Sequence, residues 1–145
     1  MKKYELTDDS ITFMGHKLFR IRAIRSFNDV AVGDLGGYIE KEENLSHDND
    51  AWIYGDACIC DNACIYGDAW IYGMTDYLCF QGLGSENRNT TFFKCKDGHI
   101  HVSCGCFSGN LAEFETKVKK THGDSKYAKE YLACIEVVKI HFEEE

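Results

Sequence analysis

The chain has 145 residues, of which 44% are hydrophobic and 13% aromatic, so it can bury the core of one domain or of two small subdomains. Its formal net charge of −8 argues against a general binder of the nucleic-acid backbone, which needs a basic face. The sequence has no apolar run of membrane-spanning or signal-peptide length. We therefore expect a cytoplasmic protein without membrane contact, whose eight cysteines are reduced and mostly buried.

The first 49 residues predict a hairpin followed by tight turns. Ile11–Phe13 and Lys17–Ile24 flank Met14-Gly15, a pattern typical of two strands joined by a turn. Such a hairpin could cover the open end of a repeat structure, where backbone groups would otherwise be unpaired. Ile39 and Leu45 are six residues apart, which indicates a degenerate first repeat. Since Ile53 follows Leu45 only after eight residues, we expect a two-residue bulge near 47–49.

Residues 50–73 are four hexads without insertion, DAWIYG, DACICD, NACIYG and DAWIYG, with alanine and isoleucine each recurring every six residues. Neither a 3.6-residue nor a 2-residue period explains this pattern. It resembles the hexapeptide repeat of left-handed parallel β-helices, in which three hexads form one triangular turn and residues 18 apart stack. The alanines and isoleucines are expected to point inward. Aromatic side chains would then form an apolar outer face suited to a homotrimer interface, made by Trp52, Tyr54, Trp70 and Tyr72.

The remaining residues predict a small α+β module. Tyr77–Phe80 is expected to be a strand, 82–91 a polar loop, and 92–104 a hairpin turning at Asp97-Gly98. Asn110 and Glu113 form a capping-box pair that should begin a helix ending at Gly123, and a second helix is expected over about 124–142. The predicted fold is mainly β: a hairpin and short β-helix in residues 1–75, then a ββαα module in residues 76–145.

The segment GLGSENRNTTFF, residues 82–93, is the first candidate site. Glycine-rich turns can present backbone amides to an anion, and an arginine adds a planar, charged fork. The alternative is a polar connecting loop, because the segment matches no Walker or dinucleotide motif. The predicted ligand-binding residues are Gly84, Ser85, Asn87, Arg88, Thr90 and Thr91.

Three further constellations have less support. His99, His101, Cys104 and Cys106 include zinc-capable atoms but lack a CxxC knuckle, so we expect exposed histidines and packed cysteines, and no metal. No motif flanks any cysteine to mark a nucleophile. His47, near the first repeat, could be the general base of an acyltransferase, although it could equally be a bulge residue.

The stretch DLGGYIEKEENLS with the following hexads, and the stretch VSCGCFSGNLAEFETKVKKTHGDSKYAKEYL, resemble small hexapeptide-repeat proteins of phages and prophages. The resemblance covers most of the chain. It implies a phage or mobile-element context, in which small oligomeric proteins without catalytic motifs often inhibit host defence. In that case the protein would lie in the host cytoplasm.

The sequence therefore predicts a non-enzymatic, trimeric binding protein without a cofactor. It would sequester a phosphorylated, nucleotide-like molecule in pockets between subunits, as an anti-defence factor. One alternative is an inhibitor that binds a host defence protein in the manner of an anti-CRISPR protein, through acidic helix faces bearing Glu113, Glu115 and Glu130. The other is a hexapeptide-type acyltransferase. Direct nucleic-acid binding is not expected.

Overall fold

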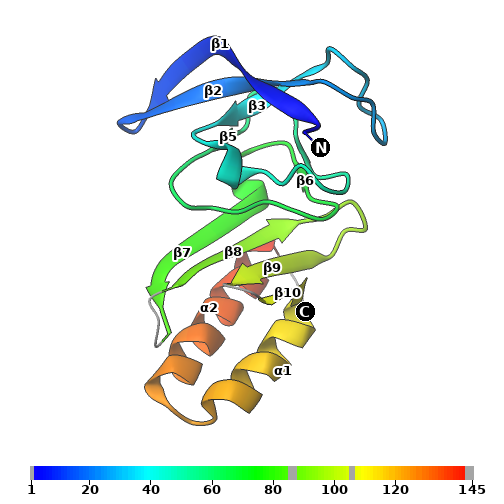
Figure 1. The fold of residues 1–145 in the computed structure, drawn as a ribbon. Coiled ribbons are helices and arrows are strands. Elements are labelled where there is room, and N and C mark those ends of the chain that lie inside the picture. Colours follow the sequence, from blue (N-terminus) through cyan, green and yellow to red (C-terminus); the bar gives the residue numbers. More distant parts are fainter. Residues whose placement is uncertain (1, 85–87, 105–106, 143–145) are drawn as a thin grey trace.

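The computed structural model describes residues 2–84, 88–104 and 107–142, with only the backbone described at Met74 and Arg88. The fold is mainly β with two C-terminal helices (Figure 1). The strands of the N-terminal half are β1 (Tyr4–Phe13), β2 (His16–Ala23), β3 (Leu35–Ile39), β4 (Trp52–Ile53), β5 (Cys58–Ile59) and β6 (Trp70–Ile71). The C-terminal half has β7 (Tyr77–Leu83), β8 (Arg88–Lys94), β9 (Ile100–Cys104), β10 (Phe107–Asn110), α1 (Leu111–His122) and α2 (Lys126–Phe142). Two 3₁₀ turns, η1 (Glu42–Asn44) and η2 (Met74–Asp76), complete the elements.

Residues 38–73, here called the repeat segment, pair with themselves in parallel. β4 pairs with β6 so that Trp52 lies beside Trp70 and Ile53 beside Ile71, as the 18-residue spacing predicts. β3 pairs with β5, and Leu45 bridges to Ile65, both at a spacing of 20 residues. The inward columns are confirmed, because the repeated alanines and isoleucines are all at most 4% exposed: Ala51, Ala57, Ala63, Ala69, Ile53, Ile59, Ile65 and Ile71.

The change in spacing from 20 to 18 residues places two extra residues between Leu45 and Ile53, where the bulge was predicted. Asn49 has a positive φ of 58° there, a conformation that asparagine tolerates better than most residues. The bulge encloses Lys3, whose side chain is fully buried and whose Nζ donates to the carbonyls of Asn49 (3.2 Å) and Ala51 (2.6 Å). The extra residues thus supply acceptors for a buried ammonium group.

The N-terminal hairpin covers one end of the repeat segment (Figure 1). β1 and β2 are antiparallel around Met14-Gly15, as predicted, and β2 continues antiparallel onto β3. The other end of the repeat segment contacts the C-terminal half through an antiparallel bridge between Ala69 and Cys95. Buried side chains from both halves, including Ile71 and Phe93, share one cluster. The division between residues 75 and 76 stays a prediction.

The C-terminal half differs from the predicted ββαα module, because four antiparallel strands precede the helices, in the order β10-β9-β8-β7. The segment expected to be a loop is largely strand, since Thr90 and Thr91 pair with β7 and β9. Thr90-Thr91-Phe92-Phe93 places one threonine and one phenylalanine on each face of the strand, and all four side chains are at most 1% exposed, so this strand is buried on both faces. Both helices pack on one face of this sheet through Phe114, Val118, Ile135 and Val138. In the part of the chain that is described, no helix is long and apolar enough to cross a membrane.

The predicted start of α1 is confirmed. The Asn110 side chain accepts a hydrogen bond from the Glu113 amide (2.8 Å), and Glu113 Oε1 accepts one from the Asn110 amide (3.0 Å). We expect Asn110→Ala to lower the free energy of unfolding by about 1 kcal/mol, because the Glu113 amide loses the side-chain oxygen that accepts its hydrogen bond. Asn110→Asp keeps the acceptor and should stay within a few tenths. Urea unfolding of both variants tests this, and equal losses in the two would contradict the capping role.

Candidate functional site

Of the predicted ligand-binding residues, the structure describes the side chains of Thr90 and Thr91 together with Gly84. Thr90 and Thr91 are at most 1% exposed and point to opposite faces of β8. The Thr90 hydroxyl donates to Cys104 Sγ (3.2 Å), whereas the Thr91 hydroxyl accepts from the Cys64 amide (3.1 Å). Both hydroxyls therefore serve packing. Because they lie on opposite faces of β8, the two hydroxyls do not face one pocket, and ligand binding by this segment stays a prediction.

Gly84, the glycine among the predicted ligand-binding residues, also has a structural role. Gly84 has a φ of +76°, and a Cβ there would lie 2.3 Å from the Tyr131 hydroxyl oxygen. Tyr131 donates from this hydroxyl to the Leu83 carbonyl (3.3 Å), so the glycine allows a helix side chain to reach the hairpin. Ser85 and Asn87 lie outside the described residues, as does the Arg88 side chain. Their predicted roles remain predictions.

The aromatic side chains of the hexads form a ladder with one covered end. Tyr54 and Tyr72 are stacked, with ring centroids 4.4 Å apart and planes 12° apart, and Trp70 meets both rings edge-on. Tyr72 is 55% exposed. Trp52, expected on the outer surface, is only 2% exposed because Tyr4 and Phe27 cover it. The hexad pattern alone does not show that Tyr4 and Phe27, which lie far from it in the sequence, pack over Trp52.

A groove lies beside the exposed end of the ladder. One hollow of about 210 Å³ is lined by Trp70, Tyr72, Asp76, Lys94, Cys95, Lys96 and Gly98. A second, of about 220 Å³, shares Asp76, Lys94 and Gly98 and extends to Thr75, Ile100, His141 and Phe142. Sequence patterns missed this groove because it joins the hexads, the turn after them and the β8–β9 hairpin, which are separated along the chain.

The groove is locally basic in an acidic protein. Lys94 and Lys96 are exposed on the β8–β9 hairpin, and Lys96 Nζ donates to Asn28 Oδ1 (2.7 Å). Asp76 is the carboxylate in the groove, and its Oδ2 already accepts the amides of Tyr72 (2.8 Å) and Gly73 (3.2 Å). Charge-assisted bonds to backbone amides partly offset that negative charge. The groove therefore combines an open aromatic face with two ammonium groups.

His47 is held by other residues and is not presented as a base. Its Nδ1 accepts from the Lys3 amide (3.1 Å), so its proton is on Nε2, which faces Glu42 Oε1 (3.2 Å). The ring also stacks on Tyr4 at 4.1 Å. Hydrogen bonds from Lys2 and then from His47 lower the pKa of Glu42. In this arrangement His47 has no free lone pair, so the structure supports the bulge-residue alternative.

Among the described residues of the His99–Cys106 pattern, His101 and Cys104 lie on opposite faces of β9. Cys104 is buried against Thr90 and Tyr131, whereas His101 lies on the half-exposed side of β9 and pairs with Asp97 (3.7 Å). Cys106 lies outside the described residues. Four of the seven described cysteines are buried. Desolvation raises the pKa of six of the seven thiols: Cys58, Cys60, Cys64, Cys79, Cys95 and Cys134. A raised pKa disfavours the thiolate that a nucleophile needs.

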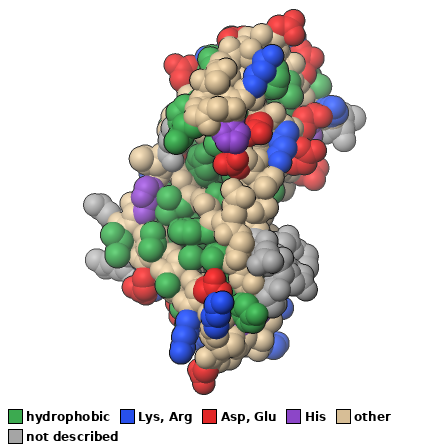
Figure 2. Space-filling model, turned by 90° about the vertical axis from the view of Figure 1, so that its left-hand side faces the viewer, with side chains coloured by type: hydrophobic (Ala, Val, Ile, Leu, Met, Phe, Trp, Pro, Cys, Tyr) green, Lys and Arg blue, Asp and Glu red, His purple; other side chains and the backbone are tan. Residues whose placement is uncertain are grey.

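The helix carboxylates of the predicted acidic face are partly engaged in local contacts. Glu113 completes the cap of α1. Glu115 pairs with Lys119 (3.2 Å) and with Lys139 of α2 (3.8 Å). On the face drawn in Figure 2, acidic side chains gather mainly over the N-terminal half, and hydrophobic ones gather over the C-terminal half. The face drawn in Figure 2 therefore does not show a continuous acidic surface over the helices.

Comparison with known proteins gives one partial similarity. No protein-family model matches the chain. A stretch of 62 residues is 39% identical to the "Uncharacterized acetyltransferase YdcK" of Escherichia coli (strain K12), covering 37% of this chain and 19% of that protein. The chain thus matches about a fifth of that relative's length. Neither result bears on a phage origin or on a host-defence partner.

Proposed function

We propose that the repeat segment is a short left-handed parallel β-helix that acts as an oligomerising scaffold for a binding site. The parallel pairs at spacings of 18 and 20 residues and the inward alanines and isoleucines support this architecture. The hairpin at one end and the β8–β9 hairpin at the other prevent further repeats from stacking. Tyr54, Trp70 and Tyr72 leave an aromatic surface at which a homotrimer could associate.

The ligand that suits the groove is a planar ring carrying an anionic group, such as a phosphorylated nucleotide. One observation carries this proposal: the Tyr54–Tyr72 stack ends at a hollow lined by Lys94 and Lys96. A base placed on the free face of Tyr72 would extend the stack by one layer. Its phosphate would then lie within reach of the two lysines. Together the two hollows fall at the lower end of the range of about 300–1,000 Å³ for small-molecule sites.

Calorimetry with AMP, ADP, coenzyme A and acetyl-coenzyme A tests this function. We expect at least one of them to bind, and Tyr72→Ala to weaken binding about 5- to 150-fold, the range for removing one base-stacking side chain. Lys94→Gln should weaken binding less and reduce its salt dependence. Lys129→Ala, a change of an exposed lysine on α2, is the matched control and should bind as the wild type does. If no nucleotide binds, or if Tyr72→Ala and Lys129→Ala bind equally, the proposal is wrong.

Acyl transfer is a second candidate, favoured by the partial similarity to a protein named as an acetyltransferase. Coenzyme A carries an adenine ring and phosphates, so an acyl donor could occupy the same groove. His141 lies at its far end and donates from Nε2 to the Thr75 carbonyl (2.7 Å), which leaves Nδ1 to accept a proton in the neutral tautomer. The test of this activity is hydrolysis of acetyl-coenzyme A, in which water accepts the acetyl group as acetate and free coenzyme A is released. Release that His141→Gln abolishes would favour the enzyme, and binding without release would favour the binding protein.

A further inference from the structure

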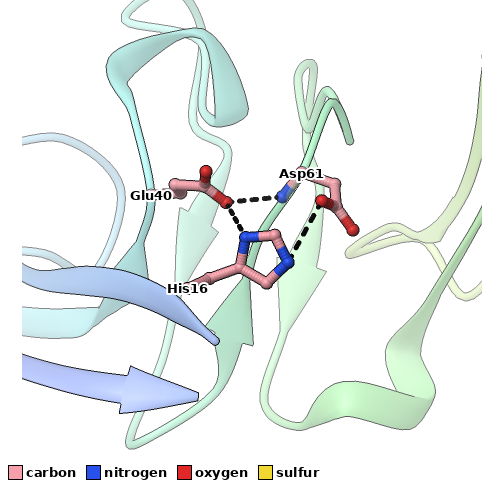
Figure 3. A group of neighbouring side chains, drawn as sticks. All are labelled: His16, Glu40 and Asp61. Carbon is pink, nitrogen blue, oxygen red and sulfur yellow. Dashed lines mark hydrogen bonds and ion pairs between the residues drawn. The ribbon is translucent and has the colours of Figure 1, made fainter. Parts of the chain in front are cut away.

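A second cluster of functional side chains lies away from the groove, where the hairpin meets the repeat segment. His16 is the first residue of β2, Glu40 follows β3 directly, and Asp61 follows β5 in the next layer. Figure 3 shows the imidazole of His16 lying between the two carboxylates. Three layers that are separate in the sequence thus contribute one side chain each to a single point. The sequence patterns did not mark any of them.

In this cluster, a carboxylate lies within hydrogen-bonding distance of each ring nitrogen of His16, so the orientation of the imidazole is fixed. Glu40 Oε1 lies 3.0 Å from His16 Nδ1 and also accepts the Asp61 amide (2.9 Å). On the other side of the ring, Asp61 Oδ1 lies 3.3 Å from His16 Nε2. Two atoms bound tetrahedrally to one zinc-sized ion at about 2.0–2.2 Å from it are about 3.3–3.6 Å apart. The Nε2 and Oδ1 atoms therefore already have the separation of neighbouring ligands.

We propose that His16 Nε2 and Asp61 bind a divalent first-row transition ion, of the Mn²⁺ or Zn²⁺ class. Glu40 would act as the positioning residue, because a carboxylate on Nδ1 fixes the ring and makes Nε2 the ligand atom. One potential ligand atom from each of the three residues lies within 4.8 Å of the others. Nitrogen and carboxylate oxygen are the donors that these ions accept.

Exposure and charge suit an exchangeable ion. His16 and Glu40 side chains are each 31% exposed and that of Asp61 is 46% exposed, so water can fill the remaining positions and the ion can enter. Glu40 and Asp61 place two carboxylates beside one imidazole. A bound dication would offset that concentration of negative charge and tie the hairpin to both layers of the repeat segment.

Mn²⁺ is the probe of choice, because it favours oxygen and nitrogen donors over the many thiols that would take up zinc. Titration of metal-free protein followed by Mn²⁺ electron paramagnetic resonance should show one saturable site per chain. Asp61→Asn should weaken it at least tenfold without unfolding the protein, because asparagine tolerates the positive φ of 56° at this position. Glu40→Gln should weaken it about 10- to 100-fold, the usual effect of losing a residue that orients a ligand.

His99→Gln removes an exposed histidine elsewhere and should bind Mn²⁺ as the wild type does. The rival interpretation is a His16 that only hydrogen-bonds to the two carboxylates, without any ion. It predicts no saturable Mn²⁺ binding in the wild type, and that result would overturn the proposal. Equal affinity in the wild type and Asp61→Asn would overturn it as well. A raised thermal midpoint with Mn²⁺ in the wild type alone would show that the ion joins the hairpin to the repeat segment.

Discussion

Gly37→Ala is expected to unfold the protein or to cost at least about 3 kcal/mol of unfolding free energy, near the upper end of overpacking effects. A Cβ at this position would lie 2.4 Å from the Ala57 carbonyl oxygen and 2.5 Å from Ile53 Cγ2. The same carbonyl accepts the Tyr38 amide (2.9 Å) in the parallel pairing of β3 with β5. The added methyl group therefore pushes the two layers of the repeat segment apart at a hydrogen bond that joins them.

Gly73→Ala is the matched control. Gly73 has an extended backbone (φ −157°), and a Cβ there meets no described atom within 4 Å. Its unfolding free energy should stay within about 0.5 kcal/mol of the wild type. Urea unfolding followed by tryptophan fluorescence compares the three proteins. If Gly37→Ala and Gly73→Ala unfold at the same urea concentration, β3 does not pack on β5 as described, and the proposed β-helix loses its first layer.

The hexads made the repeat segment predictable because each position repeats a simple steric rule. Alanine and isoleucine every six residues specified the inward columns, and the phase change between Leu45 and Ile53 located the bulge. The start of α1 was predictable for the same local reason, since Asn110 and Glu113 are three residues apart. Each of these features depends on residues that lie close together in the sequence.

The candidate sites depend on contacts between distant segments, and the sequence could not predict them. Thr90 and Thr91 looked like ligand donors, yet burial between the repeat segment and the helices uses both hydroxyls. Trp52 has the same hexad environment as Trp70, but only Trp52 is covered by the N-terminal strand. The local pattern specifies which way a side chain points, and tertiary packing decides whether anything lies over it.

Alkaline pH is expected to destabilise the protein strongly, because the junction between the two halves contains a buried thiol. Cys95 is 2% exposed and pairs with Ala69 in the bridge that joins the repeat segment to the sheet. Burial, and secondarily the charges of Asp97 and Asp68, raises its pKa from 9.0 to about 12. Between these pH values the unfolded chain loses a proton that the native chain keeps. This thiol's contribution is thus complete below pH 9 and falls by about 4 kcal/mol by pH 12.

Other ionisable groups also contribute to the change of unfolding free energy with pH. Five other thiols have a raised pKa and act in the same direction: Cys58, Cys60, Cys64, Cys79 and Cys134. So do four tyrosines whose pKa burial raises: Tyr4, Tyr54, Tyr66 and Tyr77. Lys3 acts in the opposite direction. Burial lowers its pKa from 10.5 to about 8, so the native chain releases this proton first and gains stability between those values. One lysine cannot offset several thiols, and we expect unfolding free energy to fall steeply above pH 9.

Urea unfolding from pH 8 to 11 under reducing conditions measures this fall, and Cys95→Ala isolates the junction. The variant should be about 1 kcal/mol less stable at pH 8, because a buried sulfur is lost, yet it should lose less stability than the wild type as pH rises. The two curves should therefore converge and cross at alkaline pH. Parallel curves would mean that Cys95 ionises as readily in the folded protein as in the unfolded chain. A thiol in that state would be open to water, and the bridge between Ala69 and Cys95 would not be the closed junction on which the basic groove depends.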